Sequence, residues 1–139
     1  MATAPNIAAL QRLRILVADD HPIIRKRVKA VLENHPRFDV CAEVEDGAKA
    51  IEEALRLKPD VVVLNVSMPV LGGFEAAREI KAKLPESAIV ILSSNADKYF
   101  IEEAKKVGAR AYVAKTKIGE ALIKAIGDAV ESGDFVLVD

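Results

Sequence analysis

Residues 59–69 read Pro-Asp-Val-Val-Val-Leu-Asn-Val-Ser-Met-Pro, and the four apolar residues at 61–64 decide the fold. Three of these four are β-branched, which favours a strand. No polar residue alternates with them, so the strand is expected to be buried on both faces. A strand buried on both faces is typical of a parallel sheet that carries helices on each side.

The rest of the chain repeats this unit in both directions. Short apolar segments predict strands at residues 13–18, 38–44, 61–64, 89–92 and 111–114. Apolar residues at helical spacing after each strand predict helices within residues 22–32, 47–58, 74–84, 100–107 and 118–132. Five units are too few to close an eight-stranded barrel. The sequence therefore predicts an α/β fold, an open doubly wound parallel sheet of (βα)5 type in a single domain.

The length of 139 residues is that of one domain. We expect a disordered leader at 1–11 and the folded domain at 12–132. Residues 133–139 read as the start of a linker or a C-terminal tail, with an extra edge segment as the alternative.

Composition excludes several classes of protein. Twenty Lys and Arg against 21 Asp and Glu give a net charge of −1, which argues against a strongly basic nucleic-acid binder. The single Cys41 excludes an internal disulfide framework and a zinc site built from several cysteines. No apolar stretch reaches the ~20 residues that span a bilayer, and no secretory signal opens the chain. We expect a cytoplasmic protein without membrane contact.

Small polar and charged residues follow four of the five predicted strands. The carboxyl ends of parallel strands meet at one edge of the sheet, where ligands of such folds bind. The residues that should meet there are Asp19, Asp20, Asn65, Ser67, Met68, Pro69, Ser93, Ser94, Asn95, Lys115 and Thr116. Two adjacent carboxylates repel each other, and a hard divalent cation such as Mg²⁺ would relieve that repulsion.

Each of these residues also has a plainer interpretation. Asp20 can cap the following helix, Ser93 can be a turn residue and Lys115 can be solvated. Tyr112 can be a half-buried strand aromatic. His21 has no second histidine nearby, so it is poor evidence for a transition-metal site.

Together, these residues resemble the receiver domain of bacterial two-component response regulators, over about residues 13–132. The motifs that carry the resemblance are Val-Ala-Asp-Asp-His-Pro at 17–22, residues 59–69, Leu92-Ser93 and Gly-Ala-Arg-Ala-Tyr-Val-Ala-Lys at 108–115. The Asp-Asp-His-Pro opening and the Lys-Thr after the last strand are most similar to the NarL/FixJ-type branch. The resemblance implies a flavodoxin-like strand order 2-1-3-4-5.

The resemblance also implies roles for the site residues. Asp20 would bind Mg²⁺ directly and Asp19 through water, with position 65 and the backbone carbonyl of Ser67 as further ligands. A histidine kinase would be the partner that donates a phosphoryl group to an Asp at position 65.

Further implied roles concern the response to that group. Ser93 and Lys115 would contact the phosphoryl group, and Tyr112 would reorient with Ser93. Residues 98–107 and Tyr112 would carry the switch, with homodimerisation and transcriptional control as output.

The chain departs from this pattern at one decisive position, because Asn65 stands where the family has the phospho-acceptor Asp. A neutral amide is a far poorer nucleophile than a carboxylate, so Asn65 should block phosphorylation. One carboxylate fewer should also weaken Mg²⁺ binding. Two explanations stay open: an introduced block in a working receiver, or a natural pseudo-receiver that acts as a protein-interaction module.

An enzyme or nucleotide carrier on the same fold is the third reading. The loop after the first strand, Asp-Asp-His-Pro at 19–22, would repel a phosphate without a metal. The sequence also contains neither a Walker-type motif nor a G-x-G-x-x-G loop. The reading as a signalling domain rather than an enzyme is therefore favoured.

Overall fold

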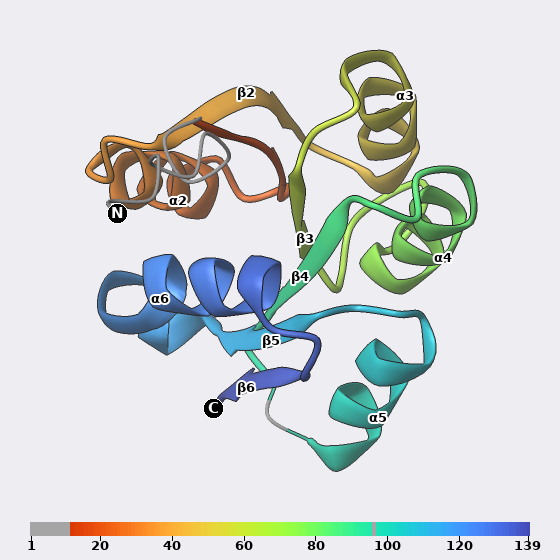
Figure 1. Cartoon of the computed structure of the whole chain (residues 1–139). Coiled ribbons are helices and arrows are strands. Elements are labelled where there is room, and N and C mark those ends of the chain that lie inside the picture. The colour runs from red at the N-terminus through yellow and green to blue at the C-terminus, as the bar shows by residue number, and fades with distance from the viewer. Residues whose placement is uncertain (1–11, 96) are drawn as a thin grey trace, which may run out of the picture.

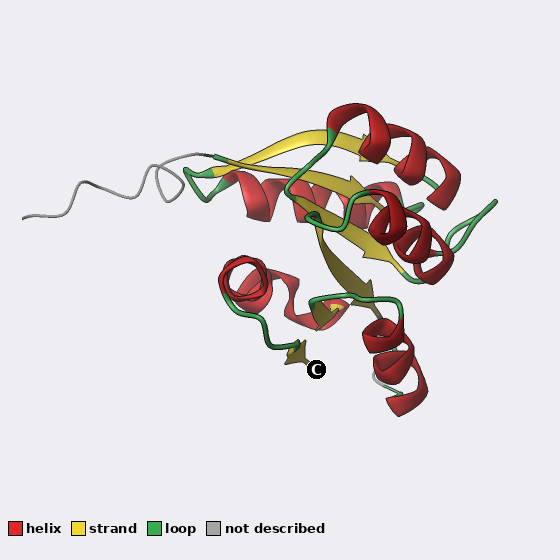
Figure 2. Cartoon of the chain, turned by 45° about the vertical axis from the view of Figure 1, so that its right-hand side comes forward, coloured by secondary structure: helices red, strands yellow, loops and turns green. Residues whose placement is uncertain are grey.

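The computed structural model describes residues 12–95 and 97–139, and the described part is a parallel sheet with helices on both faces (Figures 1 and 2). Its strands are β1 (Leu13–Ala18), β2 (Phe38–Val44), β3 (Val61–Asn65), β4 (Ala88–Ser93), β5 (Ala111–Ala114) and β6 (Val136–Val138). Its helices are α2 (Pro22–Glu33), α3 (Gly47–Leu57), α4 (Gly73–Lys83), α5 (Lys98–Lys106) and α6 (Ile118–Glu131), with a 3-10 turn η1 (Lys115–Lys117) before α6.

Alternate residues of the central strands face two separate apolar cores. One core packs Val61 and Val63 of β3 against α2 and α6. The other packs Val62 and Leu64 against α3, α4 and α5. All five residues of β3 are buried, as the unbroken apolar run predicts. The sheet therefore holds its carboxyl ends rigidly between two helical layers.

The strand order is β2-β1-β3-β4-β5-β6, so the predicted order 2-1-3-4-5 is confirmed and one strand is added. The five-unit count was one strand short because β6 has only three residues, too few to show a period. Val136 pairs with Ala111 and Val138 with Val113, in parallel register. An edge strand thus lies within the segment 133–139. The predicted leader at 1–11 lies outside the described residues.

Helix ends follow the local sequence. Pro22 occupies the first turn of α2, where its missing N–H costs nothing. Gly108 follows α5 with φ of +86°, the left-handed conformation that favours glycine after a helix. Within the described residues, we find no helix with both the length and the apolar character needed to cross a membrane.

Cys41 on β2 is partly exposed, and burial raises the pKa of its thiol. We expect iodoacetamide to alkylate Cys41 more slowly in the folded chain than in urea at pH 8, since only the thiolate reacts. Because the folded pKa is the higher one, this group stabilises the fold below the unfolded pKa of the thiol. That contribution disappears as the pH rises through the folded value. Equal alkylation rates in both states would contradict this prediction.

Candidate functional site

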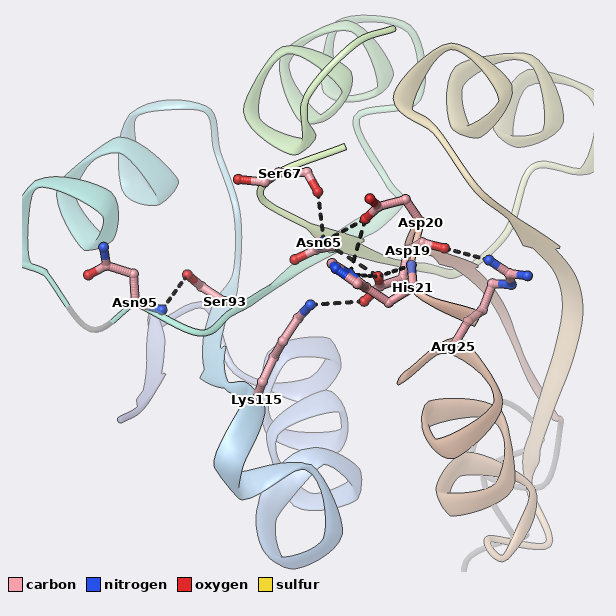
Figure 3. A network of polar contacts seen from close by, with 9 residues as sticks. All are labelled: Asp19, Asp20, His21, Arg25, Asn65, Ser67, Ser93, Asn95 and Lys115. Atoms are coloured by element: carbon pink, nitrogen blue, oxygen red, sulfur yellow. Dashed lines mark hydrogen bonds and ion pairs between the residues drawn. The ribbon is translucent and has the colours of Figure 1, made fainter. Parts of the chain in front are cut away.

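The carboxyl ends of β1, β3 and β5 bring together five of the predicted site residues (Figure 3). Asp19 and Asp20 follow β1, Asn65 ends β3 and Lys115 opens η1 after β5. The backbone carbonyl of Ser67 reaches the same point from the loop after β3. The convergence expected from the parallel sheet is therefore present.

Asp19 is the buried acid of this cluster, with a side chain only 1% exposed. Its Oδ1 accepts a hydrogen bond from the His21 backbone N–H at 2.9 Å and lies 3.1 Å from His21 Nδ1. Its Oδ2 lies 3.1 Å from Lys115 Nζ, whose side chain is 13% exposed. Among the described residues, Oδ2 is the one fully buried side-chain polar atom without an aligned hydrogen bond. The ion pair with the Lys115 ammonium group therefore offsets the cost of burying this carboxylate oxygen.

Asn65 lies at the centre of the cluster and is 4% exposed. Its amide nitrogen donates to the Ser67 carbonyl oxygen at 2.8 Å, to Asp20 Oδ1 at 3.3 Å and to Asp19 Oδ1 at 3.4 Å. Three acceptor oxygens surround this atom, so it must be the NH₂ group and not the carbonyl oxygen.

Carboxylate and carbonyl oxygens are the ligands that Mg²⁺ prefers, and this cluster offers one from each of Asp19, Asp20 and Ser67. However, the N–H groups of Asn65 already point at those oxygens. A cation and an N–H donor cannot share that position, so the residues as arranged do not fit a bound divalent cation. The sequence predicted Asn65 as a ligand through its oxygen, whereas the structure turns its nitrogen toward the ligand set.

Ser93 lies at the end of β4, and no contact joins it to the acidic cluster in the described residues (Figure 3). Its Oγ accepts a hydrogen bond from the Asn95 backbone N–H at 3.0 Å. Tyr112 is fully buried, not half-buried as predicted, and its hydroxyl donates to the Asn95 carbonyl oxygen. Burial raises the pKa of Tyr112. The backbone of Asn95 thus links the two residues predicted to form a switch.

Sequence reasoning missed the role of Arg25. Arg25 lies off the apolar stripe of α2, where side chains are usually solvated, but its own side chain is only 19% exposed. Its Nη1 donates to the Asp19 carbonyl oxygen at 2.7 Å, and its Nε lies 3.8 Å from Glu43 on β2. Arg25 therefore fixes the backbone of the loop that presents both carboxylates. No signal in the spacing distinguishes it from the neighbouring cations of α2.

We expect Lys115→Met to lower the free energy of unfolding by about 1–2 kcal/mol, since it leaves the buried Asp19 carboxylate without the partly exposed ammonium group that faces it. The loss stays moderate because Asp19 keeps its hydrogen bond from the His21 backbone. Urea unfolding measures it, with Lys117→Met as the control. Lys117 is 41% exposed, and its one ion pair among the described residues is with the exposed Glu120. Equal stability of both variants would mean that the buried pair contributes nothing.

The chain is similar to known proteins in both sequence and structure. Residues 15–127 match the family described as the response regulator receiver domain. The transcriptional regulatory protein DegU of Brevibacillus brevis is 32% identical over 125 residues, which are 90% of this chain and 53% of that protein. The chain thus spans about half the length of relatives of this kind.

Solved structures show the same likeness. A LuxR-family two-component response regulator from an Aurantimonas species superimposes with a TM-score of 0.85 and 31% identity, covering 91% of this chain and 89% of that one. The signal receiver domain of the putative response regulator NarL from Mycobacterium tuberculosis superimposes with a TM-score of 0.75 and 29% sequence identity. The match covers 84% of this chain and 98% of that one.

Proposed function

The chain belongs to the response-regulator receiver family, and from that premise we propose that it is a receiver module whose phospho-acceptor position carries an amide. The observation that carries the proposal is the place of Asn65. It ends the central strand β3 and lies between the carboxylates of Asp19 and Asp20, with Lys115 paired to Asp19. This is the point where a receiver of this family would accept a phosphoryl group.

The chemistry of position 65 decides what the chain can do. With aspartate there, a carboxylate oxygen would attack phosphorus and the donor's histidine nitrogen would leave. Lys115 and Ser93 would contact the transferred phosphoryl oxygens. The amide of Asn65 has no charged oxygen for this attack, so the chain as it stands is blocked at the transfer step.

We assign the switch to Ser93 and Tyr112, which meet at the Asn95 backbone. A group bound at position 65 would draw Ser93 away from Asn95, and Tyr112 would respond through the same residue. The surface affected comprises α5, β5 and α6. Control of dimerisation and transcription would follow in a cytoplasmic protein, with a histidine kinase as donor and DNA contacted only by a C-terminal helix-turn-helix domain.

A second function, that of a pseudo-receiver, is favoured by one observation. The amide of Asn65 joins the end of β3 to Asp19, Asp20 and Ser67 through hydrogen bonds of the protein's own groups. Such a module would bind a protein partner through the same α5–β5–α6 surface in a constant state. It would signal without phosphoryl transfer.

The deciding experiment measures the intact mass of the chain and of Asn65→Asp after incubation with Mg²⁺ and acetyl phosphate. A phosphoryl group gained by the variant alone supports the blocked receiver. Light scattering on the same samples separates the second function, because the oligomeric state of a pseudo-receiver would not respond to the phosphodonor. No mass gain in either protein would overturn the assignment of position 65.

A further inference from the structure

We propose that the side-chain amide of Asn65 acts as a built-in substitute for a divalent cation, so that the native pocket excludes Mg²⁺. The inference rests on the proposed function for the identity of the pocket. It goes beyond the block to phosphorylation, because it concerns what holds the pocket together. A missing nucleophile does not by itself require a loss of metal binding.

The geometry of the donor atom carries the inference. One nitrogen contacts three oxygens from two separate loops: the Ser67 carbonyl, Asp20 Oδ1 and Asp19 Oδ1, at 2.8, 3.3 and 3.4 Å. These are the oxygens that the family resemblance assigned to the metal. The amide nitrogen, whose hydrogens carry partial positive charge, therefore lies among these three oxygens (Figure 3).

Each carboxylate of the pocket already has polar partners without an ion. Lys115 lies against Asp19, and His21 Nδ1 lies 3.1 Å from Asp19 Oδ1 and 3.3 Å from Asp20 Oδ1. The amide bridges the two carboxylates on the remaining side. Both acids thus keep polar contacts that disperse their mutual repulsion.

Two effects should weaken the binding of a cation at this position. The cation would have to break the three contacts of the amide and turn the Asn65 side chain over. After that turn, Asn65 would offer only its neutral side-chain carbonyl oxygen as a ligand, and this oxygen attracts a divalent cation less strongly than a carboxylate does. Hydrogen bonds to charged groups are among the stronger ones in proteins, so this competition should weaken cation binding at least about tenfold.

Asn65→Ala tests this inference because the two possible roles of the side chain predict opposite signs. If the amide excludes the cation, its removal leaves two carboxylates and one carbonyl oxygen free for an ion. The alanine variant should then bind Mg²⁺ or Mn²⁺ at least about tenfold more tightly than the native chain. If Asn65 is a metal ligand, the alanine variant should bind more weakly.

Titration calorimetry with Mn²⁺ and the melting temperature in EDTA against Mg²⁺ are the two measurements. We expect no shift of the native melting temperature between EDTA and millimolar Mg²⁺, and an upward shift with Mg²⁺ for Asn65→Ala. Asn65→Ser serves as a second variant if the alanine variant does not fold. Affinity equal to or weaker than that of the native chain in the folded variants would overturn the inference.

Asn65→Asp separates this inference from the proposed function. If it binds Mg²⁺ and accepts a phosphoryl group while Asn65→Ala gains no affinity, the amide does not exclude the ion but the receiver assignment stands. If Asn65→Ala gains affinity while Asn65→Asp accepts no phosphoryl group, the exclusion stands and the receiver assignment fails.

Discussion

Gly73→Ala is expected to lower the free energy of unfolding by about 3 kcal/mol, the largest loss among the substitutions considered. A Cβ atom at Gly73 would overlap the Asn65 carbonyl oxygen and lie 2.9 Å from its carbonyl carbon. Both are backbone atoms at the end of a fully buried strand and cannot rotate away. The start of α4 would have to move off β3, and position 65 would move with it.

The matched control for this prediction is Gly127→Ala. Gly127 lies within α6, and a Cβ atom added there would meet no atom of the described residues within 4 Å. Alanine should stabilise the helix there by up to about 1 kcal/mol. Urea unfolding of both variants is the measurement. A Gly73→Ala variant as stable as the native chain would show that α4 is not held against β3 as described.

Asn65→Asp is expected to destabilise the chain by about 2–3 kcal/mol in EDTA, although aspartate is the residue that the proposed function would require at this position. The substitution exchanges an amide that donates to both Asp19 and Asp20 for a third carboxylate that repels them. Lys115 can offset only part of the added charge. Mg²⁺ should recover part of the loss, because it binds the folded pocket and not the unfolded chain.

Thermal melting in EDTA and in Mg²⁺ checks this second prediction. Asn34→Asp is the control, since it makes the same chemical change at an exposed position after α2. Its melting temperature should change little and should not depend on Mg²⁺. An Asn65→Asp variant that melts above the native chain in EDTA would mean that the carboxylates of Asp19 and Asp20 do not repel a third carboxylate at position 65.

The fold and the place of the site followed from the sequence because they depend on pattern. The apolar run at 61–64 predicted a strand buried on both faces, and β3 is such a strand. The convergence of Asp19, Asn65 and Lys115 followed from the rule that parallel strands end at one edge. Neither result needs the position of any single side chain.

The details that the sequence did not reveal depend on side-chain orientation. Asn65 was expected to offer its oxygen, but its three neighbours are all acceptors, so the nitrogen faces them. Tyr112 was expected to be half-buried, but a hydrogen bond to Asn95 lets its hydroxyl lie inside. Arg25 has the same spacing as the exposed cations of α2, but its guanidinium group donates a hydrogen bond to the backbone carbonyl oxygen of Asp19.

The short strand β6 determines what this edge of the sheet offers to other molecules. It ends the strand order at the β5 side, and among the described residues no further strand pairs with its outer edge. Within the described residues, this edge strand comprises Val136–Val138, and the exposed carboxylates of Asp134 and Asp139 flank it. A long apolar strand at this edge would favour the addition of further strands and fibril growth. Three residues between two negative charges offer an added strand few backbone hydrogen bonds.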